Sequence, residues 1–368
     1  MSIAADRLRR FVLPGLAFKA VVIGGGYATG REIAEFFLPH GPWGGLAAMA
    51  LATVVWSVVA AATFWFASVH NSRDYRQFFQ ALLGRFWVVF EIAYAAFVIL
   101  ILAVFGAAAG AIGAATLGLP PLAGTLALML GIIACVAWGN AGVERVFVWV
   151  SVLLYATYAV FFVLALAGTG DRIAAAFAAA PAPSTGWMAG GITYAGYNII
   201  GAVIVLPVTR HFRRPADAVT AGLIAGPLAM LPALLFFVAM CAFLPGIARS
   251  VLPSDTILTA LGHPWFHLIF QTMIFAALLE SGTGAVHALN ERIARTRGLT
   301  LGRYGRATAA AALLAPCMLA ADRVGLVALI ASGYRLLAWA MIAIFVLPLL
   351  VAVVVQRGRT AAPRPETI

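Results

Sequence analysis

The sequence contains little charge for a chain of 368 residues. Asp, Glu, Lys and Arg together make up 10% of it, and lysine occurs once, at Lys19. Soluble domains typically carry about 25% charged residues, whereas here 63% of the residues are apolar and the mean hydropathy is +1.00. These values exclude a soluble domain and predict an all-α polytopic membrane protein in a lipid bilayer.

Cysteine and paired intramembrane aspartates are also scarce. The three cysteines, Cys135, Cys241 and Cys317, fall in three different apolar segments without metal-ligand spacing. We expect buried free thiols, with no metal and no cofactor. The sequence lacks the paired aspartates of an intramembrane protease, and no glycine stands two residues before Ser281. An enzyme is therefore not expected.

The apolar residues are grouped into long segments. A helix needs about 20 such residues to cross a bilayer, and ten segments approach or exceed that length. Their approximate bounds are 11–37, 43–69, 86–117, 120–138, 143–167, 186–208, 215–244, 264–290, 305–321 and 324–355.

The net charge of +11 belongs to the loops between these segments. If the N-terminus is cytoplasmic, 18 of the 24 basic residues fall in cytoplasmic segments and three in outer ones. Cytoplasmic loops of membrane proteins carry such an excess. The sequence predicts a bacterial-type inner (plasma) membrane protein with both termini in the cytoplasm, and no nucleic-acid partner.

The first span contains an unusual polar and glycine-rich stretch at 21–35. Three consecutive glycines are followed by Tyr27, Thr29, Arg31 and Glu32. No water is present at the centre of a bilayer to satisfy freed backbone groups, so this composition favours a broken helix that lines a cavity. Close helix packing is the alternative explanation of the glycines. The expected substrate-binding residues here are Gly24, Gly25, Gly26, Tyr27 and Thr29, whose free N–H groups would hold a carboxylate or another anion.

A second stretch of the same kind is predicted from topology. Five spans are an odd number, so a second copy of a five-span unit would enter the membrane from the opposite side, and its first span should also be broken. The sixth span contains the expected glycines and polar residues at 190–201. We assign substrate-binding roles there to Tyr194, Gly196, Tyr197 and Asn198.

The two copies define the domain organisation. The first five-helix repeat is expected at 1–168 and the second at 186–355. An Ala- and Pro-rich outer linker, 169–185, would join them, and 356–368 would form a cytoplasmic tail.

These features resemble a known family. The run from Gly24 to Ile33 with Phe36 and Phe37, and the run from Leu279 to Gly282 followed by Glu291 and Arg292, are similar to the YkvI-type bacterial membrane proteins. That resemblance implies the LeuT-type fold of the amino acid–polyamine–organocation superfamily, with five-plus-five inverted repeats and breaks in helices 1 and 6. It also implies that the middle of helix 8 supplies hydroxyl groups to a sodium ion.

Charged residues within spans are costly and usually functional. Glu280 lies in the middle of the eighth span and is followed by Ser281 and Thr283. The hydroxyls suit Na⁺, whereas the carboxylate suits a coupling proton, with Lys19 as its partner. At the outer end, Arg31, Glu32 and Arg335 are expected to form a gate.

The sequence therefore predicts a secondary active transporter. Its substrate would be a small organic molecule, such as an amino acid or a related amine or carboxylate, moved by alternating access with H⁺ or Na⁺. A substrate-sensing receptor or channel on the same fold is the alternative. The substrate, the coupling ion, the direction of transport and the oligomeric state are left open.

Overall fold

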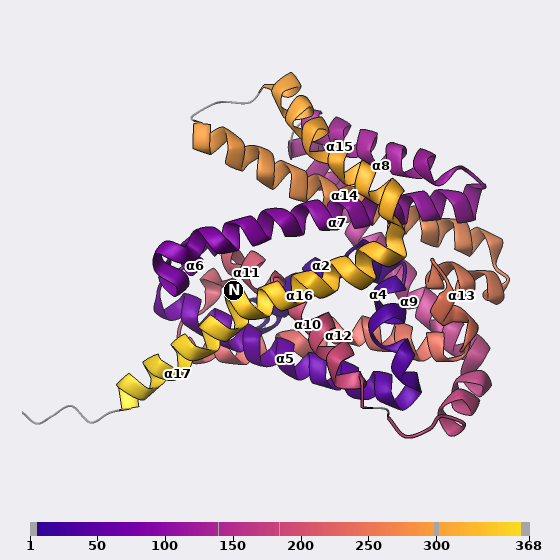
Figure 1. Cartoon of the computed structure of the whole chain (residues 1–368), viewed down its shortest axis with the longest axis horizontal. Coiled ribbons are helices and arrows are strands. Elements are labelled where there is room, and N and C mark those ends of the chain that lie inside the picture. The colour runs from indigo at the N-terminus through magenta and orange to yellow at the C-terminus, as the bar shows by residue number, and fades with distance from the viewer. Residues whose placement is uncertain (1–5, 139, 184, 298–301, 362–368) are drawn as a thin grey trace, which may run out of the picture.

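A computed structural model of the chain describes residues 6–138, 140–183, 185–297 and 302–361. Side chains are described for these residues except 25, 140–155, 291–297 and 357–361. Every regular element in this part of the chain is a helix (Figure 1). The α-helices are α2 (Leu13–Val22), α3 (Gly25–Ala28), α4 (Arg31–Phe36), α5 (Gly41–Val69), α6 (Tyr75–Leu83), α7 (Trp87–Leu117), α8 (Pro121–Trp138), α9 (Asn140–Ala178), α10 (Trp187–Asn198), α11 (Gly201–Ile204), α12 (Pro215–Cys241), α13 (Pro253–Leu261), α14 (Pro264–Arg297), α15 (Arg303–Ala328), α16 (Arg335–Met341) and α17 (Leu347–Ala361).

The ten predicted spans correspond to these helices. Within the described residues, seven helical stretches are long and apolar enough to cross a membrane. They cover eight of the predicted spans, because the stretch Arg303–Gln356 contains both the ninth and the tenth. The first and sixth spans are missing from these seven, because each is divided into shorter helices. The two spans predicted to be broken are thus the two that are interrupted.

The helices form two groups. Helices α2, α5, α10 and α12 pack on one another in the lower half of Figure 1, and α7, α8, α14 and α15 pack together in the upper half. Helix α9 contacts α12 of the first group and α14 of the second. Helix α16 runs between the groups and contacts both α10 and α7.

Small residues permit the close contact between α5 and α12. A Cβ atom on Gly222 would lie 2.3 Å from the backbone of Ala61, and one on Gly226 would lie 2.3 Å from the Ser57 hydroxyl oxygen. Two glycines four residues apart let helix backbones approach within a membrane. The Ser57 hydroxyl donates to the carbonyl of Leu223 at 3.0 Å and completes the contact.

The ends of the helices define two faces of the molecule. Helix α6 contacts α11 near one end of the bundle, and the Nε2 atoms of Gln356 and His70 are 3.3 Å apart at the same end. Helix α13 lies at the opposite end (Figure 1). We refer to these as the α6 face and the α13 face. The Asp6–Arg213 ion pair, 2.7 Å long, places the start of the described chain on the α6 face, so both ends of the described chain lie there.

The first part of the predicted linker, 169–185, is helical. Helix α9 continues without interruption to Ala178. The stretch 174–180 is rich in alanine, which has the highest helix propensity, and the helix ends shortly before Pro181 and Pro183. Helix α17 likewise continues into the predicted tail as far as Ala361; residues 362–368 lie outside the described part.

The close contact of α5 with Gly222 on α12 predicts how two matched variants differ in stability. We expect Gly222→Ala to lower the free energy of unfolding by about 1–3 kcal/mol, because the added methyl group overlaps the backbone of α5. Gly284→Ala in α14 adds the same methyl group where no atom lies within 4 Å. Unfolding of the purified protein in detergent, followed by temperature, should show a loss for the first variant only. Equal unfolding temperatures would contradict this packing.

Candidate functional site

The first span is interrupted twice. Helix α2 ends at Val22, and Ile23 has a non-helical backbone (φ −73°, ψ 79°). The N–H of Gly24 then bonds to the carbonyl of Val22 at 2.8 Å, two residues away instead of four. After the short helix α3, Gly30 adopts a left-handed conformation (φ 79°) and α4 begins. Glycine accepts positive φ at little cost, so the predicted break in the first span is present.

The break in the sixth span lies later than predicted. The residues expected to be unwound, Tyr194 to Asn198, are α-helical. The helix ends at Asn198, and a turn at Ile199 and Ile200 precedes the four-residue helix α11. A 3-10 helix, Leu206–His211, completes the span. Pro207 donates no backbone hydrogen bond, which accounts for the irregular end.

Glu32 is the buried carboxylate of this region, with 2% of its surface exposed. Its Oε2 atom accepts a hydrogen bond of 2.5 Å from the Tyr197 hydroxyl of α10. The carboxylate also accepts a hydrogen bond from the backbone N–H of Tyr27 in the break. A Cβ atom on Gly26 would lie 2.3 Å from Glu32 Oε1. The side chain of Glu32 therefore folds back against the glycines, where a substrate anion was expected.

Aromatic rings surround this carboxylate. Tyr197 packs on Tyr334 with ring centroids 4.4 Å apart, and Tyr194 lies 5.7 Å from Tyr197. The Tyr158 hydroxyl donates to the carbonyl of Ala28 at 3.2 Å, within the same break. We call Tyr158, Tyr194, Tyr197 and Tyr334 the tyrosine cluster. Its members come from α9, α10 and the π-helix Leu329–Tyr334 before α16, so it joins segments far apart in the sequence.

Tyr194 contributes a polar atom to this cluster that has no partner. Its side chain is fully buried, and its hydroxyl makes no hydrogen bond within the described residues. A buried hydroxyl without a partner costs about 1–3 kcal/mol. Such an atom beside a buried carboxylate indicates a place where a ligand supplies the missing contact.

Three other predicted binding residues, Thr29, Asn198 and Gly196, contact the protein's own backbone or a neighbouring helix. The Thr29 hydroxyl donates to the carbonyl of Gly26 at 3.0 Å, within the break. Asn198 donates to the carbonyl of Tyr194 at 3.2 Å, at the end of α10. A Cβ atom on Gly196 would lie 3.1 Å from Ala338 on α16. The glycine at 196 therefore serves close helix packing, and the structure does not support its predicted role as a lining residue.

Arg31 lies at the α13 face. Its guanidinium pairs with Glu35 at 2.8 Å and donates to the carbonyls of Ala248 and Ser250 at 3.0 and 2.8 Å. Arg31 thus binds the connection between α12 and α13. It does not pair with Glu32, which accepts its hydrogen bond from Tyr197. Arg335, the third predicted gate residue, is exposed, whereas its neighbour Tyr334 is buried in the tyrosine cluster. The structure therefore does not place Arg335 with Glu32.

Helix α13 bridges the two helix groups. On one side, the backbone N–H of Ser254 donates to the carbonyl of Thr29 at 3.0 Å. On the other side, Asp255 Oδ1 lies 2.7 Å from His267 Nε2 and 3.1 Å from Gln271 Nε2 on α14. Helix α13 is thereby fixed to both the broken helix and α14, so it covers the break at this face.

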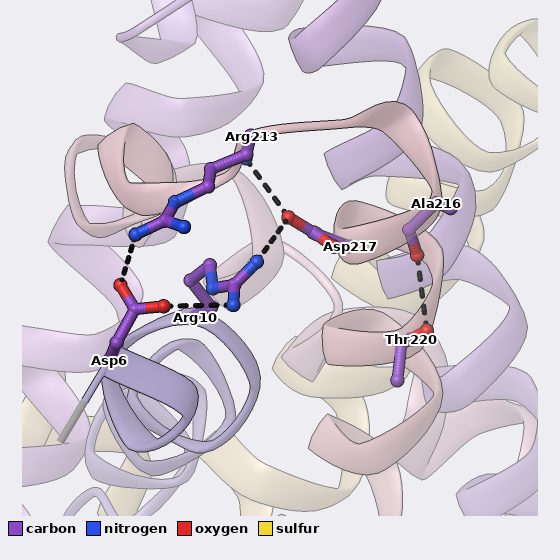
Figure 2. A network of polar contacts seen from close by, with 6 residues as sticks. All are labelled: Asp6, Arg10, Arg213, Ala216, Asp217 and Thr220. Carbon is purple, nitrogen blue, oxygen red and sulfur yellow. Dashed lines mark hydrogen bonds and ion pairs between the residues drawn. The ribbon is translucent and has the colours of Figure 1, made fainter. Parts of the chain in front are cut away.

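A polar network joins three segments at the α6 face (Figure 2). Arg10 pairs with Asp6 at 2.8 Å and with Asp217 at 3.3 Å, and Arg213 pairs with Asp6 at 2.7 Å. Asp217 also accepts from the backbone N–H of Arg213 at 3.0 Å. The network links the segment before α2 to the loop before α12, and so fixes α2 and α12 to each other.

The predicted coupling residues lie on α2 and α14. Helix α14 packs against α3, and on it Glu280 and Ser281 are half-buried. The Thr283 side chain is 5% exposed, and its hydroxyl has no hydrogen-bond partner within the described residues. Lys19 is half-buried and lines a cavity of about 490 Å³, together with Ile23, Tyr27, Tyr158, Phe162 and others. This cavity adjoins the tyrosine cluster through Tyr158.

Sequence reasoning missed Tyr158, and it did not include Tyr334 among the substrate-binding tyrosines. Both are tyrosines within apolar spans, as Tyr194 and Tyr197 are. Their hydroxyl groups in a membrane segment are a usable signal, because each needs a partner. Neither lies beside a glycine-rich break in the sequence, and only the fold brings them to Glu32.

The contacts of Arg31 predict the behaviour of α13. We expect Arg31→Gln to release the chain at Ala248 and Ser250, and to raise the labelling rate of a cysteine at the buried position Ser254 severalfold. Arg249→Gln removes an exposed arginine from the same connection and is the matched control. Maleimide labelling of both variants in the Ser254→Cys background, in detergent, measures this. Equal rates would show that Arg31 does not hold α13 in place.

The comparisons with known proteins concern the whole chain. No family model matches the sequence, and no curated protein matches it. Among solved structures, the chain is similar to MhsT in complex with L-phenylalanine, with a TM-score of 0.63 and 18% sequence identity. The match covers 94% of this chain and 87% of MhsT. It shows the LeuT-type fold, with about ten membrane helices in a five-plus-five inverted repeat and breaks in helices 1 and 6.

Proposed function

We propose that the protein is a secondary active transporter of a small organic solute, and that it works by alternating access. The observation that carries this proposal is the buried site at the first break, where Glu32, the Tyr194 hydroxyl and the tyrosine cluster meet in the middle of the fold. Solvent reaches little of it, because α13 covers the α13 face. A buried polar site between interrupted helices is the usual place of substrate binding in such proteins.

The substrate class follows from the size and chemistry of the site. The adjoining cavity of about 490 Å³ suits a small organic molecule. MhsT was solved with L-phenylalanine, and the aromatic lining here suits a solute with an apolar body. An amino acid or a related amine or carboxylate is therefore proposed.

The proposed motion has a physical basis in the contacts. The Arg10 network joins α2 to α12, and the glycine contact joins α12 to α5. These contacts let the first group of helices move as one body against the second. Helix α13 would have to release either Thr29 or α14 to open its face. We propose that this face is the outer one, that both termini are cytoplasmic, and that 1–168 and 186–355 are the two repeats.

The coupling ion is proposed to bind at α14. Thr283 offers a buried hydroxyl that lacks a partner, which suits Na⁺, because hard cations prefer oxygen ligands. Glu280, one turn earlier, is the carboxylate that would hold H⁺ in a proton-coupled cycle. Both lie on the helix that packs against the first break, so ion and substrate sites would be close enough to influence each other.

Exchange of substrate across a membrane tests transport itself. The purified protein in proteoliposomes should support counterflow of at least one radiolabelled compound from a panel of amino acids, amines and organic acids. A receptor or channel would bind without counterflow, because net exchange requires alternating exposure of a single site. Saturable binding without counterflow for every compound would therefore favour the sensor alternative and contradict transport.

Two sets of variants separate the coupling ions. If H⁺ is coupled, we expect Glu280→Gln to keep substrate binding and to lose uptake driven by a pH gradient, because the amide cannot exchange a proton. If Na⁺ is coupled, Ser281→Ala with Thr283→Ala should instead raise the sodium concentration needed for half-maximal uptake. Glu91→Gln, a half-buried carboxylate on α7, is the control. Normal gradient responses in both sets would exclude α14 as the coupling site.

A further inference from the structure

The first break is predicted to bind an anion, and in the structure that anion belongs to the protein. The Glu32 carboxylate lies against Gly26 and accepts from the Tyr27 N–H, in the position expected for the carboxylate of a substrate. The Glu32 side chain already fills this place, so a second carboxylate could not enter there without displacing it. The recognition chemistry of this site is therefore the reverse of the predicted one.

Glu32 has no positively charged partner within the described residues. Its hydrogen-bond donors are the Tyr197 hydroxyl and the Tyr27 N–H, while the neighbouring Arg31 binds Glu35 and two carbonyls. A carboxylate can accept about four hydrogen bonds, so lone pairs remain for a ligand. A buried carboxylate without a counter-ion is costly, and a bound ammonium group would remove this cost.

The tyrosine cluster also favours a positively charged ligand. Faces of aromatic rings attract cations, and rings grouped around a point recognise amines. Tyr197 and Tyr334 pack on each other beside the carboxylate, and Phe36 lies 5.8 Å from Tyr197. The unpartnered Tyr194 hydroxyl provides an acceptor for a further ammonium hydrogen. A carboxylate, aromatic faces and a free hydroxyl together form the environment of an organic cation.

From these observations we infer that the substrate is a small organic amine, held by its ammonium group at Glu32, and that it needs no carboxylate next to the amine. This inference rests on the proposed transport function and narrows its substrate class. The apolar part of the amine would extend toward the cavity lined by Tyr27 and Tyr158. Glu32 and Tyr194 are then substrate-binding residues, and Tyr197 positions the carboxylate.

Three related compounds test the recognised group. Phenethylamine carries only the amine, 3-phenylpropionate only the carboxylate, and L-phenylalanine both. We expect phenethylamine and close primary amines to raise the unfolding temperature of the purified full chain, and 3-phenylpropionate to leave it unchanged. Binding of L-phenylalanine and 3-phenylpropionate without phenethylamine would overturn the inference, as would the absence of stabilisation by every amine in a panel of varied chain length.

Variants of Glu32 test the assigned residue. Glu32→Gln keeps the size of the side chain and one acceptor oxygen for the Tyr197 hydroxyl, so it should fold, but it should weaken amine binding by roughly 30-fold or more. Glu32→Asp keeps the charge and should retain measurable binding. Glu91→Gln removes a carboxylate outside the site and should leave the affinity unchanged. Equal amine affinity in Glu32→Gln and the unmodified chain would overturn the assignment.

The glycines supply an independent pair of variants. In Gly26→Ala the added methyl group would meet Glu32 and displace it, whereas in Gly168→Ala on α9, outside the site, it would make an ordinary contact with Leu261 at 3.5 Å. Only the first should weaken amine binding.

If amines fail to bind but a carboxylate compound undergoes counterflow, the inference fails and the transport function stands. If no compound of any class binds or exchanges, both fail.

Discussion

The buried carboxylate of Glu32 is the constraint on which the centre of this fold depends. It lies in a membrane-embedded region where an unsatisfied charge would cost several kcal/mol, and its partners come from two different helices. The Tyr27 N–H is available because the first helix is interrupted, and the Tyr197 hydroxyl is available because α10 is intact at that point. This arrangement requires glycine at position 26, because any side chain there would occupy the place of the Glu32 carboxylate.

The same interruption connects the site to both faces. Toward the α13 face, the carbonyl of Thr29 is satisfied by Ser254, so the broken helix and the covering helix share a hydrogen bond. Toward the α6 face, α2 is held to α12 by the Arg10 network. Movement of α2 and α3 relative to α14 would therefore displace α13, the Glu32 carboxylate and the surroundings of the coupling residues together. Alternating access requires such a joint movement.

Much of this arrangement could be predicted from the sequence, because membrane spans, basic loops and glycine runs are local signals. The ten spans and the break at Gly24 were readable in this way. The pairing of Glu32 with Tyr197 was not, because it joins residues 165 positions apart. The break in the sixth span was placed too early, since the glycine at 196 serves close packing against α16 and not unwinding. Helix α9 extends into the predicted linker through an alanine-rich run, and it ends before Pro181.

The most direct test is an experimental structure of the full chain with a transported amine bound. The account predicts density for the ligand with its nitrogen within hydrogen-bond distance of the Glu32 carboxylate and the Tyr194 hydroxyl, enclosed by the tyrosine cluster. A ligand bound elsewhere, with Glu32 still held only by Tyr197 and the Tyr27 N–H, would show that this carboxylate is a structural element of the broken helix and would contradict the account.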